Sequence, residues 1–316
     1  MPDKAVPRAL APRAAKRHGV TRWLTGRDKT VVALFLGVPA VLVAVIIWGA
    51  AIAAIILSFA SWDGIGGLRN IRWIGLRNYA TIFTNYPPFW PALEHNLIWM
   101  LVFSLIAAPA GLLFAVLIDR GLKGSRVYET ALFLPVMLST ALIGIIWQLI
   151  YSPDQGLING LLGTAGQATA VDWLGNPKIN LWAVLVAACW RQIGYIMILY
   201  LAGLKGVDHT VREAAQLDGC NEWQVFRYAT FPALAPINIV VLIVTIIEAL
   251  RSFDLVYVIN GGTNGLELIS ALVTTTTMGE ASRVGFGSAL GTVLLVLSLA
   301  PIVAFLIHSF RQETKR

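Results

Sequence analysis

Long apolar runs separated by short polar segments dominate the chain. Six runs reach the length of about 20 residues that a helix needs to cross the hydrocarbon core of a bilayer. Backbone polar groups find no water in hydrocarbon and must bond within the segment, so these runs predict helices. The predicted spans are residues 31–59, 97–118, 131–151, 182–204, 233–259 and 286–307. We therefore expect an all-α polytopic membrane protein with six transmembrane helices.

Composition supports this interpretation. Of 316 residues, 13% are charged and the mean hydropathy is +0.71, whereas about a quarter of a soluble chain is charged. The first run is longer than the apolar core of a secretory signal and follows a 30-residue basic flank, so we interpret it as a retained span. Residues 1–30 are rich in Pro, Ala and Arg and predict a disordered tail near anionic lipid. Residues 31–310 then form the membrane domain, followed by a short tail at 311–316.

The distribution of Lys and Arg predicts the orientation, because cytoplasmic loops carry an excess of both residues. Of the 24 Lys and Arg residues, 17 fall in the two termini and in segments 119–127 and 205–232, and five fall in the opposite loops. The remaining two, Arg191 and Arg251, lie inside predicted spans. Both termini and segment 205–232 are therefore expected to face the cytoplasm.

Several other functions find little support in the sequence. The basic residues follow the membrane topology and lack interleaved aromatic residues, which argues against nucleic acid binding. The four histidines are scattered without a second histidine or a cysteine at i+3 or i+4, so no metal site is predicted. Neither GxxxxGK[ST] nor GxGxxG is present. If transport uses ATP, another chain must bind the nucleotide.

One polar island, EAAQLDGCNEWQVFRYATFP at residues 213–232, interrupts the apolar pattern. Its first part predicts a short helix that ends at Gly219, which can adopt a left-handed conformation without a Cβ penalty. Asn221 is then expected to cap a second helix, with Gln224 completing a capping box. Pattern alone leaves two roles open: a hairpin resting on lipid headgroups and a hairpin that docks on a protein. A DNA-reading helix-turn-helix would need more basic residues than Arg227.

The motif Glu213-Ala214-Ala215, followed by Gly219 and by a hydrophobic residue before Pro232, resembles the EAA loop of binding-protein-dependent ABC importer permeases. The resemblance implies a type I ABC importer permease fold in which this loop docks on a separate ATPase subunit. The residues expected to couple to that ATPase are Glu213, Ala214, Ala215, Asp218, Gly219, Trp223, Phe226 and Pro232.

Three further segments, WRQIGYIMILYLAGLKGV, FDLVYVINGG and GFGSALGTVLLVL, are similar to the carbohydrate-uptake branch related to the maltose permease subunits. That branch implies an importer of a sugar or oligosaccharide in the plasma membrane of a prokaryote. Its expected partners are ATPase subunits, a second and different permease subunit, and an extracytoplasmic binding protein. ATP and magnesium are expected on the ATPase, and this chain is expected to bind no cofactor and to have no enzyme activity.

Polar residues inside predicted spans are candidates for contacts with the transported substrate, because such residues are costly in lipid and usually face a cavity or a partner. One group follows Trp190 in the fourth span, and another shares a stripe of the fifth span. These candidates are Arg191, Gln192, Tyr195, Thr245, Glu248 and Ser252. The alternative role of Glu248 is neutralisation of Arg191 or Arg251.

Other functional classes remain as alternatives. An ABC permease for glycerol phosphate or a polyamine would share the same fold. A secondary transporter would need an inverted repeat with interrupted helices, which the sequence does not display. An intramembrane enzyme would need a nucleophile beside a base, and the titratable residues in the spans offer no such pair.

Overall fold

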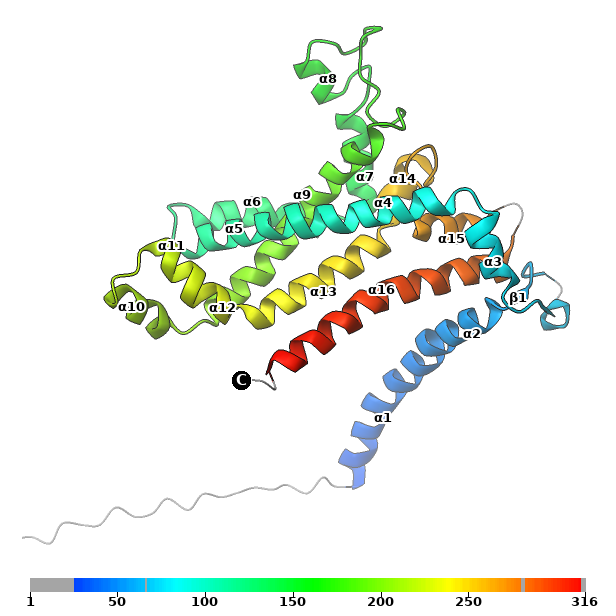
Figure 1. The fold of residues 1–316 in the computed structure, drawn as a ribbon, viewed down its shortest axis with the longest axis horizontal. Coiled ribbons are helices and arrows are strands. Elements are labelled where there is room, and N and C mark those ends of the chain that lie inside the picture. The colour runs from blue at the N-terminus through cyan, green and yellow to red at the C-terminus, as the bar shows by residue number, and fades with distance from the viewer. Residues whose placement is uncertain (1–25, 66, 280–281, 314–316) are drawn as a thin grey trace, which may run out of the picture. The chain divides into compact units, whose positions relative to one another are not determined.

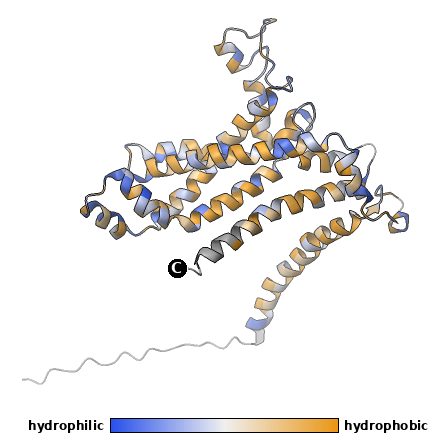
Figure 2. Ribbon diagram, in the orientation of Figure 1, coloured by the Kyte–Doolittle hydropathy of each residue, from blue (hydrophilic) through white to orange (hydrophobic). Residues whose placement is uncertain are grey.

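A computed structural model describes residues 26–65, 67–279 and 282–313 of the chain. Residues 1–25 of the predicted tail and residues 314–316 lie outside the described part. The chain divides into two compact units, residues 1–52 and 53–316. The described residues are mostly helical, as the sequence predicts, and a hairpin with many hydrophilic residues at 209–233 stands out from the long apolar helices (Figures 1 and 2).

The first predicted span is confirmed as a helix. It consists of α1 (Gly26–Leu42), the π-helical segment η1 (Val43–Gly49) and α2 (Ala50–Leu57). Residues Asp28–Leu57 are long and apolar enough to cross a membrane, and none of the residues in their most apolar stretch is buried within the chain. Exposed aliphatic side chains along this helix are suited to contact lipid.

After the first span, a short extended segment precedes the second. Strand β1 (Ala60–Ser61) pairs antiparallel with β2 (Arg72–Trp73), and α3 (Arg77–Thr84) follows. The second span runs through α4 (Phe89–Val102), η3 (Phe103–Ala107) and α5 (Ala108–Asp119) as one 31-residue helical stretch. It contains the predicted span and extends it toward the N-terminus.

The third predicted span is wrong as a single helix. Residues 131–151 lie in α6 (Ser125–Met137) and α7 (Thr140–Ile150), whose axes meet at 102°. Leu138 adopts an extended conformation after Pro135, and the Ser139 side chain accepts a hydrogen bond from the Leu142 amide. A serine N-cap satisfies an amide at the start of a new helix, so the chain stops and restarts there.

The fourth predicted span is confirmed as α9 (Asn180–Lys205), which follows the short helix α8 (Leu157–Leu161). It packs against α5, α6 and α13 (Figure 1). A Cβ atom on Gly111 of α5 would lie 2.6 Å from the Ile196 side chain of α9. Glycine lets the two backbones approach closely, as small residues do between membrane helices.

The polar island forms the predicted hairpin. Helix α10 (His209–Leu217) is followed by Gly219 with φ of +82°, which confirms the left-handed turn. Asn221 and Gln224 form the predicted capping box at α11 (Glu222–Gln224). The helix continues through η4 (Val225–Thr230) and α12 (Phe231–Ala233), and a 71° bend then leads into the fifth span.

The fifth predicted span is also interrupted. It consists of α13 (Ala235–Arg251) and α14 (Asp254–Asn260), with Ser252 and Phe253 between them. The Ser252 hydroxyl donates to the Glu248 carbonyl at 2.9 Å, and the Ser270 hydroxyl donates to the Ser252 carbonyl at 2.6 Å. These side-chain bonds replace backbone bonds that a continuous helix would make.

The segment between the fifth and sixth predicted spans contains an apolar helix that the sequence analysis did not predict, α15 (Ile269–Met278). The last span is confirmed within α16 (Val284–Glu313). Among the residues described, four helical stretches are long and apolar enough to cross a membrane, and the count rises to six if each bent pair forms one span. In Figure 1, α13 lies between the α4–α5 stretch and α16, and it packs against all of them.

Candidate functional site

A cavity of about 220 Å³ lies where α4, α7, α9 and the break between α13 and α14 meet. Apolar rings from Trp99, Phe103 and Phe253 form part of its wall. Its polar lining comes from Thr140, Arg191, Gln192, Glu248, Arg251, Ser252 and Asp254. Apolar walls with a few convergent polar groups are typical of small-molecule sites.

An ion pair crosses the cavity from α9 to α13. The Arg191 Nη1 and Glu248 Oε2 atoms are 3.7 Å apart, and the side chains are 28% and 38% exposed. This distance is too long for a direct hydrogen bond. The carboxylate therefore keeps acceptor capacity that a hydroxyl group in the cavity could use.

Two buried donors beside the ion pair lack partners within the described chain. Gln192 is 1% exposed and Trp99 is fully buried, and neither Gln192 Nε2 nor Trp99 Nε1 has a hydrogen-bond acceptor there. A buried donor without a partner is unfavourable by about 1–3 kcal/mol. Both residues line the cavity, but these two nitrogen atoms are themselves buried, so an acceptor on a bound solute would reach them only after the side chains turn toward the cavity.

The helix break contributes two more charges. Arg251 lies in the last turn of α13 and Asp254 in the first turn of α14, where each charge has the sign that the helix dipole favours. Both residues also line a larger groove of about 620 Å³ formed with α15 and α16. The break therefore forms the wall between the cavity and this groove.

The structure brings together four of the six residues predicted to contact substrate. Arg191, Gln192, Glu248 and Ser252 line the cavity, whereas Tyr195 and Thr245 are not among its lining residues. Glu248 lies opposite Arg191, one of the two arginines that the sequence offered as its charge partner. Sequence reasoning missed Trp99 and Phe103, although a tryptophan inside a predicted span was a usable signal.

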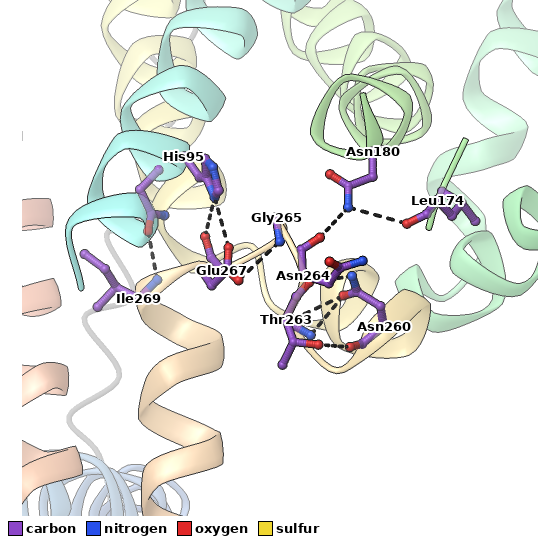
Figure 3. A network of polar contacts seen from close by, with 11 residues as sticks. His95, Leu174, Asn180, Asn260, Thr263, Asn264, Gly265, Glu267 and Ile269 are labelled. Carbon is purple, nitrogen blue, oxygen red and sulfur yellow. Dashed lines mark hydrogen bonds and ion pairs between the residues drawn. The ribbon is translucent and has the colours of Figure 1, made fainter. Parts of the chain in front are cut away.

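Polar contacts fix the loop after α14 against two other helices (Figure 3). His95 Nδ1 lies 2.9 Å from the Glu267 carbonyl oxygen, and Asn180 donates to the Asn264 carbonyl at 2.7 Å. The Asn96 side chain accepts from the Ile269 amide at 3.0 Å. These bonds connect the loop to α4 and α9, which both line the cavity. The sequence did not predict this network, because its members lie far apart along the chain.

The hairpin presents a surface suited to a protein partner. Glu213, Ala214, Asp218 and Gly219 are exposed, and Leu217 and Trp223 are 89% and 68% exposed. The remaining predicted coupling residues are Ala215 and Phe226, which are half-buried, and Pro232, which is exposed. Thr230, which helical spacing would place on the same face as Trp223 and Phe226, is buried. Large exposed apolar side chains next to carboxylates are typical of docking surfaces.

The site shows no sign of metal chemistry in the part of the chain that is described. There, no group of three or more His, Cys, Asp or Glu residues is arranged to hold a metal ion. The polar groups around the cavity can donate and accept hydrogen bonds. The arrangement can bind a polar solute inside a membrane protein, which is the property of a transport permease.

Comparisons with known proteins agree with this class. Residues 107–316 match the family described as the binding-protein-dependent transport system inner membrane component. The chain is 31% identical to the trehalose/maltose transport system permease protein MalF of Thermococcus litoralis, over 76% of this chain and 81% of that protein. It is 29% identical to the xylose/arabinose import permease protein XacH of Haloferax volcanii, over 92% of each chain.

A solved structure shares the fold. A bacterial alginate ABC transporter, determined in complex with an alginate pentasaccharide-bound periplasmic protein, matches with a TM-score of 0.76 and 23% identity, over 92% of this chain and 96% of that chain. The chain therefore belongs to the binding-protein-dependent transport system inner membrane component family. It is a membrane permease subunit of an ABC importer and not an enzyme.

Proposed function

We propose that this permease imports a neutral sugar or oligosaccharide and holds it in the cavity between α9 and α13. The observation that carries the proposal is the lining, in which the partly exposed Arg191–Glu248 pair, without a direct hydrogen bond between its members, lies among the aromatic residues Trp99, Phe103 and Phe253. Sugar hydroxyls both donate and accept hydrogen bonds, and sugar rings stack on aromatic faces. The named sugar substrates of MalF and XacH support the same class.

The charge of the lining favours a neutral solute. Two arginines, Arg191 and Arg251, are balanced by Glu248 and Asp254 among the lining residues. A site for glycerol phosphate would need an excess of positive charge, and a site for a polyamine would need an excess of negative charge. Neither excess is present. The roles of Tyr195 and Thr245 stay predictions from the sequence.

We further propose that the hairpin at residues 209–233 docks on an ATPase subunit that binds ATP and magnesium. In this arrangement both termini and the hairpin face the cytoplasm of a prokaryotic cell. A second, different permease subunit completes the path, and an extracytoplasmic binding protein delivers the sugar. The exposed Leu217 and Trp223 side chains beside Glu213 and Asp218 support the docking role.

The test is uptake by the native complex, purified through a tag on this chain and reconstituted with its binding protein. ATP-driven uptake should be inhibited by neutral sugars and not by glycerol phosphate or polyamines. Gln192→Leu should lower the apparent affinity by about 5-fold to 150-fold, because it removes a buried donor near the solute. The matched control is Gln155→Leu, the same change at an exposed loop position. Unchanged affinity in Gln192→Leu would contradict the proposed site.

A further inference from the structure

Two adjacent residues of opposite charge end the second span, and each reaches a different helix of the hairpin. Asp119 Oδ2 lies 2.8 Å from Arg212 Nη1 in α10, and Arg120 Nη1 lies 2.6 Å from Glu222 Oε2 in α11. The partners are 93 and 102 residues apart in the chain.

The two pairs differ in burial. The Asp119 and Arg212 side chains are 17% and 21% exposed, whereas Arg120 and Glu222 are 47% and 75% exposed. Exposed pairs contribute little, while removal of one member of a buried pair leaves an uncompensated charge. Arg212 also donates to the Leu204 carbonyl in α9 at 3.4 Å. The Asp119–Arg212 pair therefore connects three helices.

Local structure alone does not favour Asp119 at this position. It is the last residue of α5, and the C-terminal end of a helix favours positive charge. The negative charge of Asp119 is therefore stabilised by the contact with Arg212 and not by the dipole of α5. Arg120 and Glu222, in contrast, stand at helix ends that already suit their charges.

A hollow of about 150 Å³ separates the end of α5 from the hairpin, lined by residues of both. Its wall includes all four charged residues together with Val116, Leu204 and Phe226. The two ion pairs cross this hollow and join the end of α5 to both helices of the hairpin. They give the hairpin a direct route to α5, in addition to the indirect route through α9, which precedes the hairpin in the chain and packs against α5.

The other end of the same helical stretch reaches the cavity. Residues Phe89–Asp119 form one stretch of 31 residues, and Trp99 and Phe103 within it line the cavity. At a rise of about 1.5 Å per residue, Phe103 lies roughly 24 Å along the axis from Asp119. The stretch is helical throughout, with the π-helical segment η3 between these rings and Asp119, and displacement at Asp119 would be passed along it toward the two rings.

We propose that Asp119 and Arg212 are positioning residues that transmit movement of the hairpin to the cavity through the α4–α5 stretch. The inference rests on the proposed docking of the hairpin on an ATPase. Neither residue lines the cavity, and both side chains are largely buried. Loss of the pair should therefore leave both binding events in place and weaken the connection between them.

The experiment measures sugar uptake per ATP hydrolysed in the reconstituted native complex. Asp119→Asn keeps size and Arg212→Gln shortens the side chain; each removes one charge, and both should lower this ratio by about 5-fold to 10-fold with the ATPase still bound. The exchange of both charges, Asp119→Arg with Arg212→Asp, should recover most of the ratio. Arg126→Glu, a charge change at an exposed residue of α6, is the matched control.

The outcomes separate this inference from the proposed function. An unchanged ratio in Asp119→Asn overturns the inference, as does a doubly exchanged variant no better than its single variants. Loss of ATPase from the Asp119→Asn complex would also overturn it, because the pair would then only hold the hairpin's docking surface. If the wild-type complex contains no ATPase, the docking proposal itself fails.

Discussion

At the scale of single residues, a substitution of Glu248 distinguishes a role in substrate binding from a role in neutralising Arg191. The Glu248 carboxylate lies 3.7 Å from Arg191 Nη1, with no direct hydrogen bond between them. We predict that Glu248→Gln weakens the apparent affinity for sugar by about 1–3 kcal/mol, because the amide loses acceptor capacity. The thermal stability of the purified complex should change little. The measurements are uptake kinetics and a melting curve on the same preparation.

A role of Glu248 in charge neutralisation alone predicts a different result for Glu248→Gln. If the carboxylate only neutralises Arg191, the amide leaves a partly buried cation without a counter-charge. The complex would then melt earlier or fail to assemble, with unchanged affinity in the assembled fraction. Glu94→Gln, at an exposed position of α4, controls for the change of charge.

Gly219 is a second residue whose role follows from local geometry. Its φ is +82°, and no atom lies within 4 Å of the position that a Cβ would occupy. Gly219→Val should therefore be unfavourable by about 1–2 kcal/mol through backbone strain and not through a clash. Uptake should fall while insertion into the membrane persists. Gly219→Asn, which tolerates the left-handed region better, should retain more uptake, and equal uptake in both variants would contradict the strain argument.

At the scale of helices, the contact between α5 and α9 determines how the cavity is supported. A Cβ on Gly111 would meet the Ile196 side chain at 2.6 Å and the Ile193 carbonyl at 3.1 Å. Gly111→Leu should force the helices apart and destabilise the chain by about 1–3 kcal/mol. The check is the melting temperature in detergent. Gly37→Leu, where no atom lies within 4 Å of the Cβ position, should melt like the wild type.

At the scale of the whole molecule, the hairpin surface is expected to determine assembly with the ATPase. Glu213 and Asp218 are exposed, and carboxylates accept strong hydrogen bonds from Arg or Lys of a partner. Glu213→Lys or Asp218→Lys should release the ATPase or uncouple hydrolysis from uptake. Subunit composition by mass spectrometry and sugar-stimulated hydrolysis are the measurements.

A matched surface reversal gives the control for assembly. Asp154→Lys changes an exposed carboxylate between α7 and α8 and should leave ATPase retention unchanged. If the hairpin variants also retain the ATPase and full sugar-stimulated turnover, the hairpin rests on lipid, which is the role that the sequence pattern left open.

Local physical chemistry explains what the sequence determined by itself. Apolar runs of spanning length predict membrane helices wherever the backbone has no other source of hydrogen bonds, and α9 and α16 follow this rule. Gly219, Asn221 and Gln224 act within a few residues, so the turn and the capping box could be predicted from the chain alone. These features depend on neighbours in sequence.

Only the tertiary structure decided the features that depend on distant partners. The break between α13 and α14 is stabilised in part by Ser270, 18 residues beyond Ser252. Arg191 and Glu248 line the cavity and Tyr195 does not, because the packing of α9 against its neighbours determines which faces of the helices point toward the cavity. Asp119 and Arg212 meet across 93 residues. The hydropathy of a segment indicates whether the segment is buried in the membrane. It does not indicate which distant residues the segment contacts.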